Sequence, residues 1–122
     1  MKQLILVIVS LLVVTSTFSQ KTDCEKIRTG IFYANTGSKK GLPSISVERT
    51  ETTQKEIIEG EEAVLYDLKW IDSCKFVLEH TEGEDKIRIV VTITKIRKKY
   101  YEYTATRLGF PLVTGRMYLE KR

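Results

Sequence analysis

The sequence predicts an all-β domain, an antiparallel meander of seven or eight strands that forms a small barrel or a sandwich after an N-terminal signal helix. Three observations predict this fold. Apolar and polar residues alternate with period two through most of the chain after residue 27, as they do in strands with one buried face. Turn residues or charges interrupt the alternation about every 8 to 12 residues, as in sandwiches and barrels. No segment shows convincing helical spacing.

The first residues have the pattern of a secretory signal peptide. Lys2 precedes an apolar run over residues 4–14, and small residues follow it. This order predicts a signal peptide over residues 1–19, with cleavage between Ser19 and Gln20. The alternative is a retained membrane anchor, but a bilayer span needs about 20 apolar residues. We therefore expect an exported protein, periplasmic or secreted, with no stable membrane span after cleavage.

Cleavage would leave residues 20–122 as a single all-β domain. Its length is 122 − 19 = 103 residues, which suits one hydrophobic core. Its charge is 19 basic minus 16 acidic residues, or +3, since only Lys2 is lost with the signal peptide. This excess is small and scattered, so a nucleic-acid partner is not expected.

Two cysteines, Cys24 and Cys74, lie in the exported part. In an oxidising compartment such an isolated pair predicts one disulfide. The alternative is two free thiols that bind a metal. Zinc would need two further ligands, and the chain has one histidine and no third cysteine. No metal or cofactor is therefore predicted.

The first four expected strands differ in the strength of their alternation. Strand 44–49 turns Ile45 and Val47 inward, and strand 54–59 is weaker. The expected ranges are 27–34, 44–49, 54–59 and 63–70, the last with Val64, Tyr66, Leu68 and Trp70 on one face.

The later strands alternate more clearly. The clearest is 86–95, whose Ile87, Ile89, Val91 and Ile93 share a face rich in β-branched residues. The expected ranges are 75–80 with Phe76 and Leu78 inward, 86–95, 99–107 with Tyr101, Tyr103 and Ala105 on one face, and 115–121 with Met117 and Leu119 inward.

Charged residues occupy the outward faces of these strands, which disfavours a membrane-spanning barrel. They are Glu48, Lys55, Asp67, Lys69, Arg88 and Glu102. The strands together are not expected to place two titratable residues inward.

Two stretches carry a resemblance to known proteins. They are Thr29-Gly30-Ile31-Phe32, which follows Cys24, and Trp70-Ile71-Asp72-Ser73-Cys74-Lys75-Phe76-Val77-Leu78. The chain resembles small exported Bacteroidetes proteins that have no assigned function. Its strand order also resembles a small lipocalin-like meander, which implies a ligand-binding role by fold analogy alone. The Gly-x-Trp strand typical of lipocalins is absent near the N-terminus.

The hairpin around residue 98 carries the sharpest local feature. Basic residues beside aromatics on a sheet can stack bases or sugar rings, although charged hairpin tips also discourage edge pairing. The candidate surface-binding patch consists of Lys95, Arg97, Lys98, Lys99, Tyr100, Tyr101 and Tyr103.

No catalytic residue is predicted. His80 is the only histidine, and no nucleophile with a base beside it can be recognised. We therefore expect a non-catalytic binding or interaction module of the cell envelope whose partner is an envelope protein. The alternatives are a lipocalin-like carrier of a small apolar ligand and a hydrolase of unrecognised type. A hollow apolar interior would favour the carrier, and paired polar groups inside it would favour an enzyme.

Overall fold

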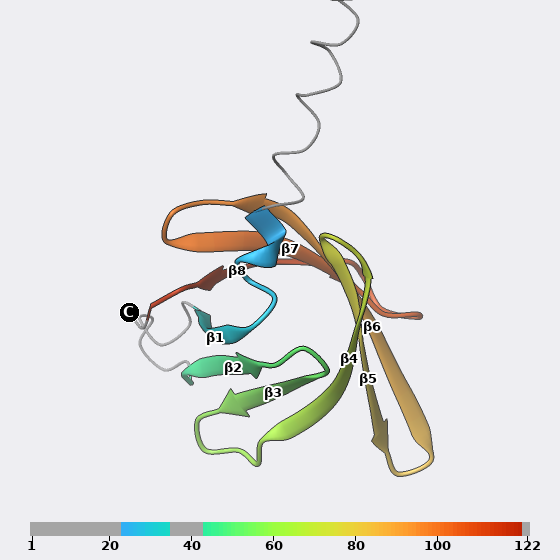
Figure 1. The fold of residues 1–122 in the computed structure, drawn as a ribbon. Helices are drawn as coiled ribbons and strands as arrows, with labels where there is room; N and C mark the ends of the chain where they lie inside the picture. The colour runs from blue at the N-terminus through green and yellow to red at the C-terminus, as the bar shows by residue number, and fades with distance from the viewer. Residues whose placement is uncertain (1–22, 35–42, 121–122) are drawn as a thin grey trace, which may run out of the picture.

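The protein folds as one closed barrel of eight antiparallel strands (Figure 1). A computed structural model describes residues 23–34 and 43–120. Each strand pairs with its neighbours in sequence, and the last strand pairs with the first. The strands are β1 (Gly30–Ala34), β2 (Ile45–Arg49), β3 (Thr53–Ile58), β4 (Val64–Asp72), β5 (Lys75–Glu82), β6 (Asp85–Ile96), β7 (Tyr100–Thr106) and β8 (Val113–Tyr118). The predicted all-β meander is confirmed, and it takes the form of a barrel.

The predicted start of the first strand and the predicted end of the last are each wrong by three residues. The strand predicted from residue 27 begins at Gly30, because residues 23–25 form a helical turn and the side chain of Ile27 packs into the core. The last strand runs over residues 113–118 and not 115–121, so Leu119 lies beyond it and is 36 % exposed.

The two ends of the barrel differ. The N-terminal segment, residues 23–29, and the β2–β3, β4–β5 and β6–β7 turns lie at one end, which we call the closed end. The β3–β4, β5–β6 and β7–β8 loops lie at the other, the open end. Cys24 and Ile27 of the N-terminal segment belong to the buried core together with Phe32, Phe76 and Tyr101. The N-terminal segment therefore covers the closed end with apolar side chains, and we call it the stopper.

The disulfide predicted between Cys24 and Cys74 is confirmed. It joins the helical turn of the N-terminal segment to the β4–β5 turn, with the two Cα atoms 5.4 Å apart and a sequence separation of 50. In the chain-entropy model a covalent loop of this size stabilises the fold by about 4 kcal/mol. The bond therefore fastens the stopper to the barrel wall.

The predicted signal peptide and its cleavage site at Ser19 and Gln20 lie outside the described residues. Within the described part of the chain, no helix has the length and apolar character needed to cross a bilayer.

Candidate ligand-binding cavity

The interior of the barrel holds a cavity of about 580 Å³ that opens to solvent. Its wall is mainly apolar and is built from inward positions of seven strands. The apolar wall consists of Ala34, Ile45, Val47, Phe76, Leu78, Ile89, Val91, Ala105 and Met117. A volume of this size lies within the range of small-molecule pockets, about 300 to 1,000 Å³.

Strand register places these side chains opposite one another. Leu78 of β5 pairs with Ile89 of β6, and Val91 of β6 pairs with Ala105 of β7. Because successive side chains alternate between the two faces of a sheet, every second residue of these strands faces the cavity. Small residues such as Ala105 leave the space that larger ones would fill.

Arg49 lines the closed end of the cavity and forms its polar floor. The residue is only 5 % exposed. Its Nε donates to Oε1 of Gln54 at 2.8 Å, and its Nη1 donates to the carbonyl oxygen of Ile27 at 2.9 Å. Its Nη2 donates to the hydroxyl of Tyr101 at 2.8 Å. The guanidinium thus connects β2, β3 and β7 to the N-terminal segment.

Aromatic rings surround the same guanidinium. The Arg49 Cζ atom lies 4.7 Å from the ring centroids of both Phe32 and Phe76, and 5.7 Å from that of Tyr101. Within the described residues, Arg49 forms no ion pair with a carboxylate, so neutral acceptors and ring faces replace the water around its charge.

Burial at the floor of the cavity keeps the Tyr101 phenol neutral. Burial raises the pKa of Tyr101 by disfavouring the phenolate, and the Coulombic attraction and hydrogen bond of Arg49 oppose this shift without cancelling it. The Tyr101 hydroxyl therefore accepts a hydrogen bond from the cation while remaining uncharged.

Glu56 and Tyr103 supply polar groups higher in the cavity. Burial raises the pKa of the Glu56 carboxyl, and repulsion from Glu61 adds to this shift. Burial likewise raises the pKa of Tyr103, with further contributions from Tyr101 and Glu56. Among the described residues, no hydrogen-bond or ion-pair partner meets the Glu56 carboxyl, so it can contact a ligand directly.

Gly115 makes room for the Tyr103 ring. A Cβ atom on Gly115 would lie 2.5 Å from the Tyr103 hydroxyl and 2.6 Å from its Cζ atom. The ring therefore lies flat over the backbone of the neighbouring strand β8, where Gly115 is the register partner of Tyr103. Glycine at this position keeps the aromatic ring against the wall and out of the cavity.

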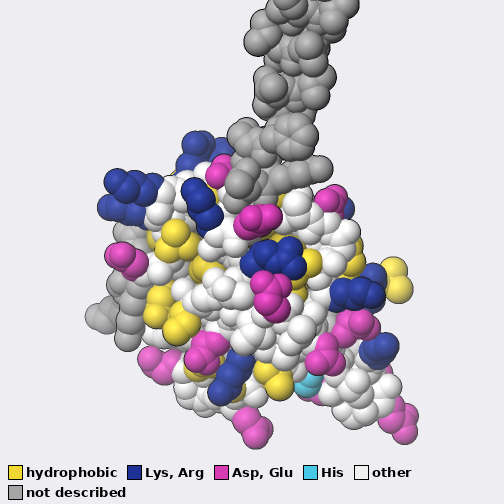
Figure 2. All heavy atoms as spheres, in the orientation of Figure 1, with side chains coloured by type: hydrophobic (Ala, Val, Ile, Leu, Met, Phe, Trp, Pro, Cys, Tyr) yellow, Lys and Arg dark blue, Asp and Glu magenta, His cyan; other side chains and the backbone are white. Residues whose placement is uncertain are grey.

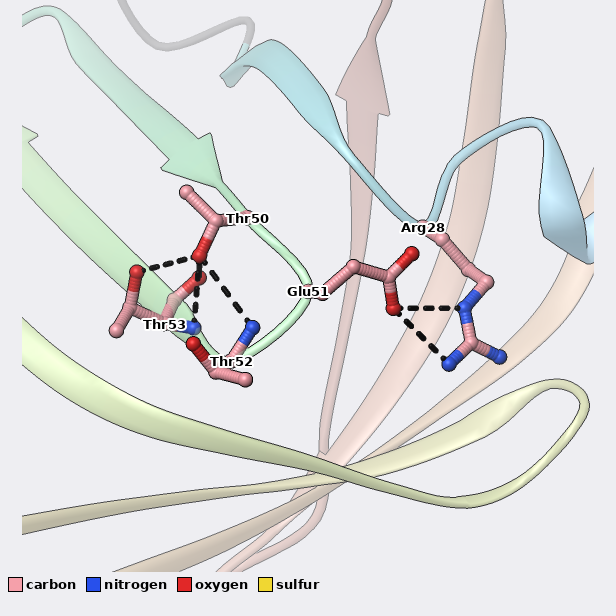
Figure 3. A network of polar contacts seen from close by, with 5 residues as sticks. All are labelled: Arg28, Thr50, Glu51, Thr52 and Thr53. Atoms are coloured by element: carbon pink, nitrogen blue, oxygen red, sulfur yellow. Dashed lines mark hydrogen bonds and ion pairs between the residues drawn. The ribbon is translucent and has the colours of Figure 1, made fainter.

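Polar contacts at the rim of the closed end hold the β2–β3 turn to the N-terminal segment. Arg28 points toward Glu51, and its Nη2 lies 3.2 Å from Oε2 of that residue (Figure 3). The hydroxyl of Thr50 accepts from the backbone N–H of Thr53 at 3.0 Å and lies 2.7 Å from the Thr53 hydroxyl. These contacts stabilise the turn that follows Arg49.

The structure divides the predicted basic and tyrosine patch. Lys95, Arg97, Lys98 and Lys99 are exposed near the closed end, whereas Tyr101 is 1 % exposed and lies inside the barrel. Tyr103 lines the cavity, and Tyr100 packs against Tyr118 on β8. Tyr101 and Tyr103 therefore do not share a surface with the four basic residues. Figure 2 shows basic and acidic side chains interspersed over the visible face.

His80 contacts an aromatic ring away from the cavity floor. Its ring centroid lies 5.5 Å from that of Tyr66. Neither residue is among those that line the cavity.

The expectation that the strands together place no two titratable residues inward is wrong. Arg49 of β2 and Glu56 of β3 both line the cavity, together with Arg116 and three tyrosines, Tyr101, Tyr103 and Tyr118. The alternation itself carried this signal, because Arg49 continues the inward positions of Ile45 and Val47. The residue type argued against it, since arginine is rarely buried. Glu56 lies in the strand whose alternation was weakest.

Comparison of the chain with protein-family models, with curated proteins and with solved structures finds no match.

Proposed function

We propose that the protein binds a small, mainly apolar ligand inside its barrel, as a non-catalytic carrier or binding module. The cavity of about 580 Å³ with its apolar wall carries this proposal. An interior filled by side chains would have favoured an interaction module that uses only its surface. The hollow interior supports the lipocalin-like alternative instead.

The polar groups of the cavity would orient the ligand. Most ligand pockets combine an apolar wall with a few polar groups that fix orientation. Arg49 already donates to three acceptors of the protein, whereas Glu56 has a carboxyl without a protein partner among the described residues. We therefore assign Glu56 and Tyr103 to recognition of a polar group on the ligand, and Arg49 to the floor.

The compartment forms part of the same proposal. The Cys24–Cys74 disulfide persists in an oxidising environment, and residues 1–19 have the sequence pattern of an export signal. We infer that the carrier works in the periplasm or outside the cell, where an apolar molecule needs protection from water.

A neutral fluorescent probe tests the proposal. N-phenyl-1-naphthylamine fluoresces when it leaves water, and we expect saturable binding of one probe per barrel. Ala105→Phe places a ring in the cavity and should weaken binding at least about tenfold, the effect of losing about 1.4 kcal/mol of binding free energy. Thr104→Phe, on the opposite face of β7, is the matched control and should bind as the unmodified protein does.

The outcome decides between an interior site and a surface one. Probe binding that is absent, or that survives Ala105→Phe unchanged, would rule out a ligand in the cavity. If the probe binds as expected, mass spectrometry of the protein recovered after export identifies the natural ligand.

A further inference from the structure

We propose that the β7–β8 loop docks the protein on an anionic lipid bilayer by inserting its apolar side chains among the headgroups. This inference goes beyond ligand binding and does not rest on it, because its observations concern the outer surface at the open end.

Large apolar side chains are concentrated on this loop and on the first residue of β8. Leu108 is 99 % exposed, Phe110 and Leu112 are each 59 % exposed, and Val113 is 54 % exposed. These four lie within six consecutive residues, whereas the other exposed large apolar residues of the described chain, Ile31, Leu65, Ile71 and Leu119, are spread over four separate positions. Such a cluster marks an interaction site, unlike single exposed apolar residues.

The loop is a formed turn that holds these side chains away from the core. The backbone N–H of Phe110 donates to the carbonyl oxygen of Arg107 at 3.0 Å. Gly109 has a φ of 87°, a conformation that other residues rarely adopt. The Arg107 Cζ atom lies 4.3 Å from the Phe110 ring centroid. In Figure 1 the loop extends past β6, away from the β6–β7 turn.

Basic side chains flank the apolar cluster. Arg107 of the loop shares a surface hollow with Arg88 and Lys86 of β6, and Asp85 is the one acidic residue that lines the same hollow. Lys86 pairs with Glu79 at 3.2 Å, whereas no carboxylate among the described residues pairs with Arg88 or Arg107. Their two charges are therefore available to anionic headgroups.

This combination fits a bilayer better than a protein partner. A stable protein interface buries about 800 Å² on each partner, whereas four side chains on one projecting loop offer a narrow tip. Interfacial membrane binding needs a few apolar side chains at the acyl boundary and cations near anionic phosphates. The loop lies at the open end of the barrel, so docking turns this end toward the bilayer.

Vesicle sedimentation tests the proposal with residues 20–122. The barrel and its disulfide lie within residues 23–120, and omitting residues 1–19 avoids vesicle binding by the apolar run 4–14. We expect binding to vesicles of phosphatidylcholine and phosphatidylglycerol in equal parts, and much weaker binding to phosphatidylcholine alone. Binding should also weaken as salt is added.

Paired substitutions locate the contact. Leu108→Ser with Phe110→Ser should weaken vesicle binding at least about tenfold, because exposed side chains that insert are removed without disturbing the core. Leu65→Ser with Ile71→Ser removes two exposed apolar residues from β4 (59 % and 50 % exposed) and should leave binding largely unchanged. Arg88→Gln and Arg107→Gln should each weaken binding about fivefold on the anionic vesicles.

A fluorophore on the loop reports insertion directly. Both native cysteines are in the disulfide, so Leu108→Cys can be labelled alone with nitrobenzoxadiazole. Its emission should shift to shorter wavelength on anionic vesicles, and the same label on Ile71→Cys, near the closed end, should not shift. The proposal is overturned by absence of vesicle binding, by binding that survives the loop substitutions, or by a loop-dependent dimer without vesicle binding, which would assign the loop to a second copy of the chain.

Discussion

Arg49 is a cation that folding removes from water and surrounds with neutral groups. Transfer of a charge into a core is costly unless hydrogen bonds replace its hydration. Three hydrogen bonds and three ring faces supply this replacement. The acceptors come from the N-terminal segment, β3 and β7, so one side chain holds together parts of the chain that are distant in sequence.

Removal of this guanidinium should destabilise the barrel strongly. Arg49→Met keeps much of the side-chain volume but leaves the carbonyl oxygen of Ile27 and the polar groups of Gln54 and Tyr101 without their donor. Each buried group without a partner costs about 1 to 3 kcal/mol, so we expect the free energy of unfolding to fall by about 3 kcal/mol or more in urea titrations.

Arg28→Met is the control for the loss of an arginine near the same end. Arg28 makes a partly exposed ion pair with Glu51, and such pairs contribute at most about 1 kcal/mol. Equal losses for the two variants would show that the buried hydrogen bonds of Arg49 are not decisive.

Glu56 makes stability depend on pH through its raised pKa. The folded state binds the proton of this carboxyl more tightly than the unfolded chain, whose ordinary value is 4.5. The neutral carboxyl therefore favours folding fully below pH 4.5, and this contribution is lost as the pH rises through the folded-state pKa. At neutral pH the ionised carboxylate opposes folding.

The amide variant Glu56→Gln should consequently raise the melting temperature at neutral pH. The gain should shrink on acidification and disappear near and below pH 4.5, where both side chains are neutral. Thermal denaturation across this pH range measures it, with Glu84→Gln in the exposed β5–β6 turn as the control. A gain that stays constant with pH would contradict the assignment to ionisation.

At the scale of elements, the contact between β7 and β8 sets the width of the cavity. Tyr103 and Gly115 are register partners, and the ring of the first covers the backbone of the second. A glycine within a strand normally weakens it. Here the close approach of an aromatic ring explains why glycine is present.

Gly115→Ala should therefore destabilise the barrel by about 1 to 3 kcal/mol, because the new methyl group forces the Tyr103 ring toward the cavity. In a Tyr103→Leu background the same alanine should be neutral, or stabilising by up to about 1 kcal/mol. A double-mutant cycle on unfolding free energies measures this coupling. An equal cost in both backgrounds would show that the strain lies elsewhere.

At the scale of the whole molecule, the barrel followed from period-two alternation and the disulfide from the count of cysteines. Both are local or compositional signals, and tertiary structure did not override them. The N-terminal segment could not be predicted as a stopper, because residues 27–29 continue the alternation of the first strand while their backbone leaves the sheet. Only the core packing of Ile27 and the hydrogen bond from Arg49 decide that conformation.

The cavity was less predictable than the fold. The cavity exists because opposite walls of the barrel lie far enough apart, and the alternation does not encode that distance. Arg49 and Glu56 lie at inward positions of their strands, so pattern alone would have placed them inside. Their charge predicted an outward position instead, because a buried charge is stable only with hydrogen-bond partners. For Arg49 these partners include Tyr101, which comes from a strand distant in sequence.

Closure of the barrel depends on a short seam. Among the described residues, β1 and β8 pair only at Tyr33 with Tyr118 and at Ala34 with Met117. The first of these pairs spans 118 − 33 = 85 residues, whereas every other strand pair joins consecutive strands. We expect contacts this distant in sequence to form late in folding, because closing a long loop costs entropy, so weakening the seam should speed unfolding and hardly slow folding. The seam should thus set how long the barrel stays closed around its core.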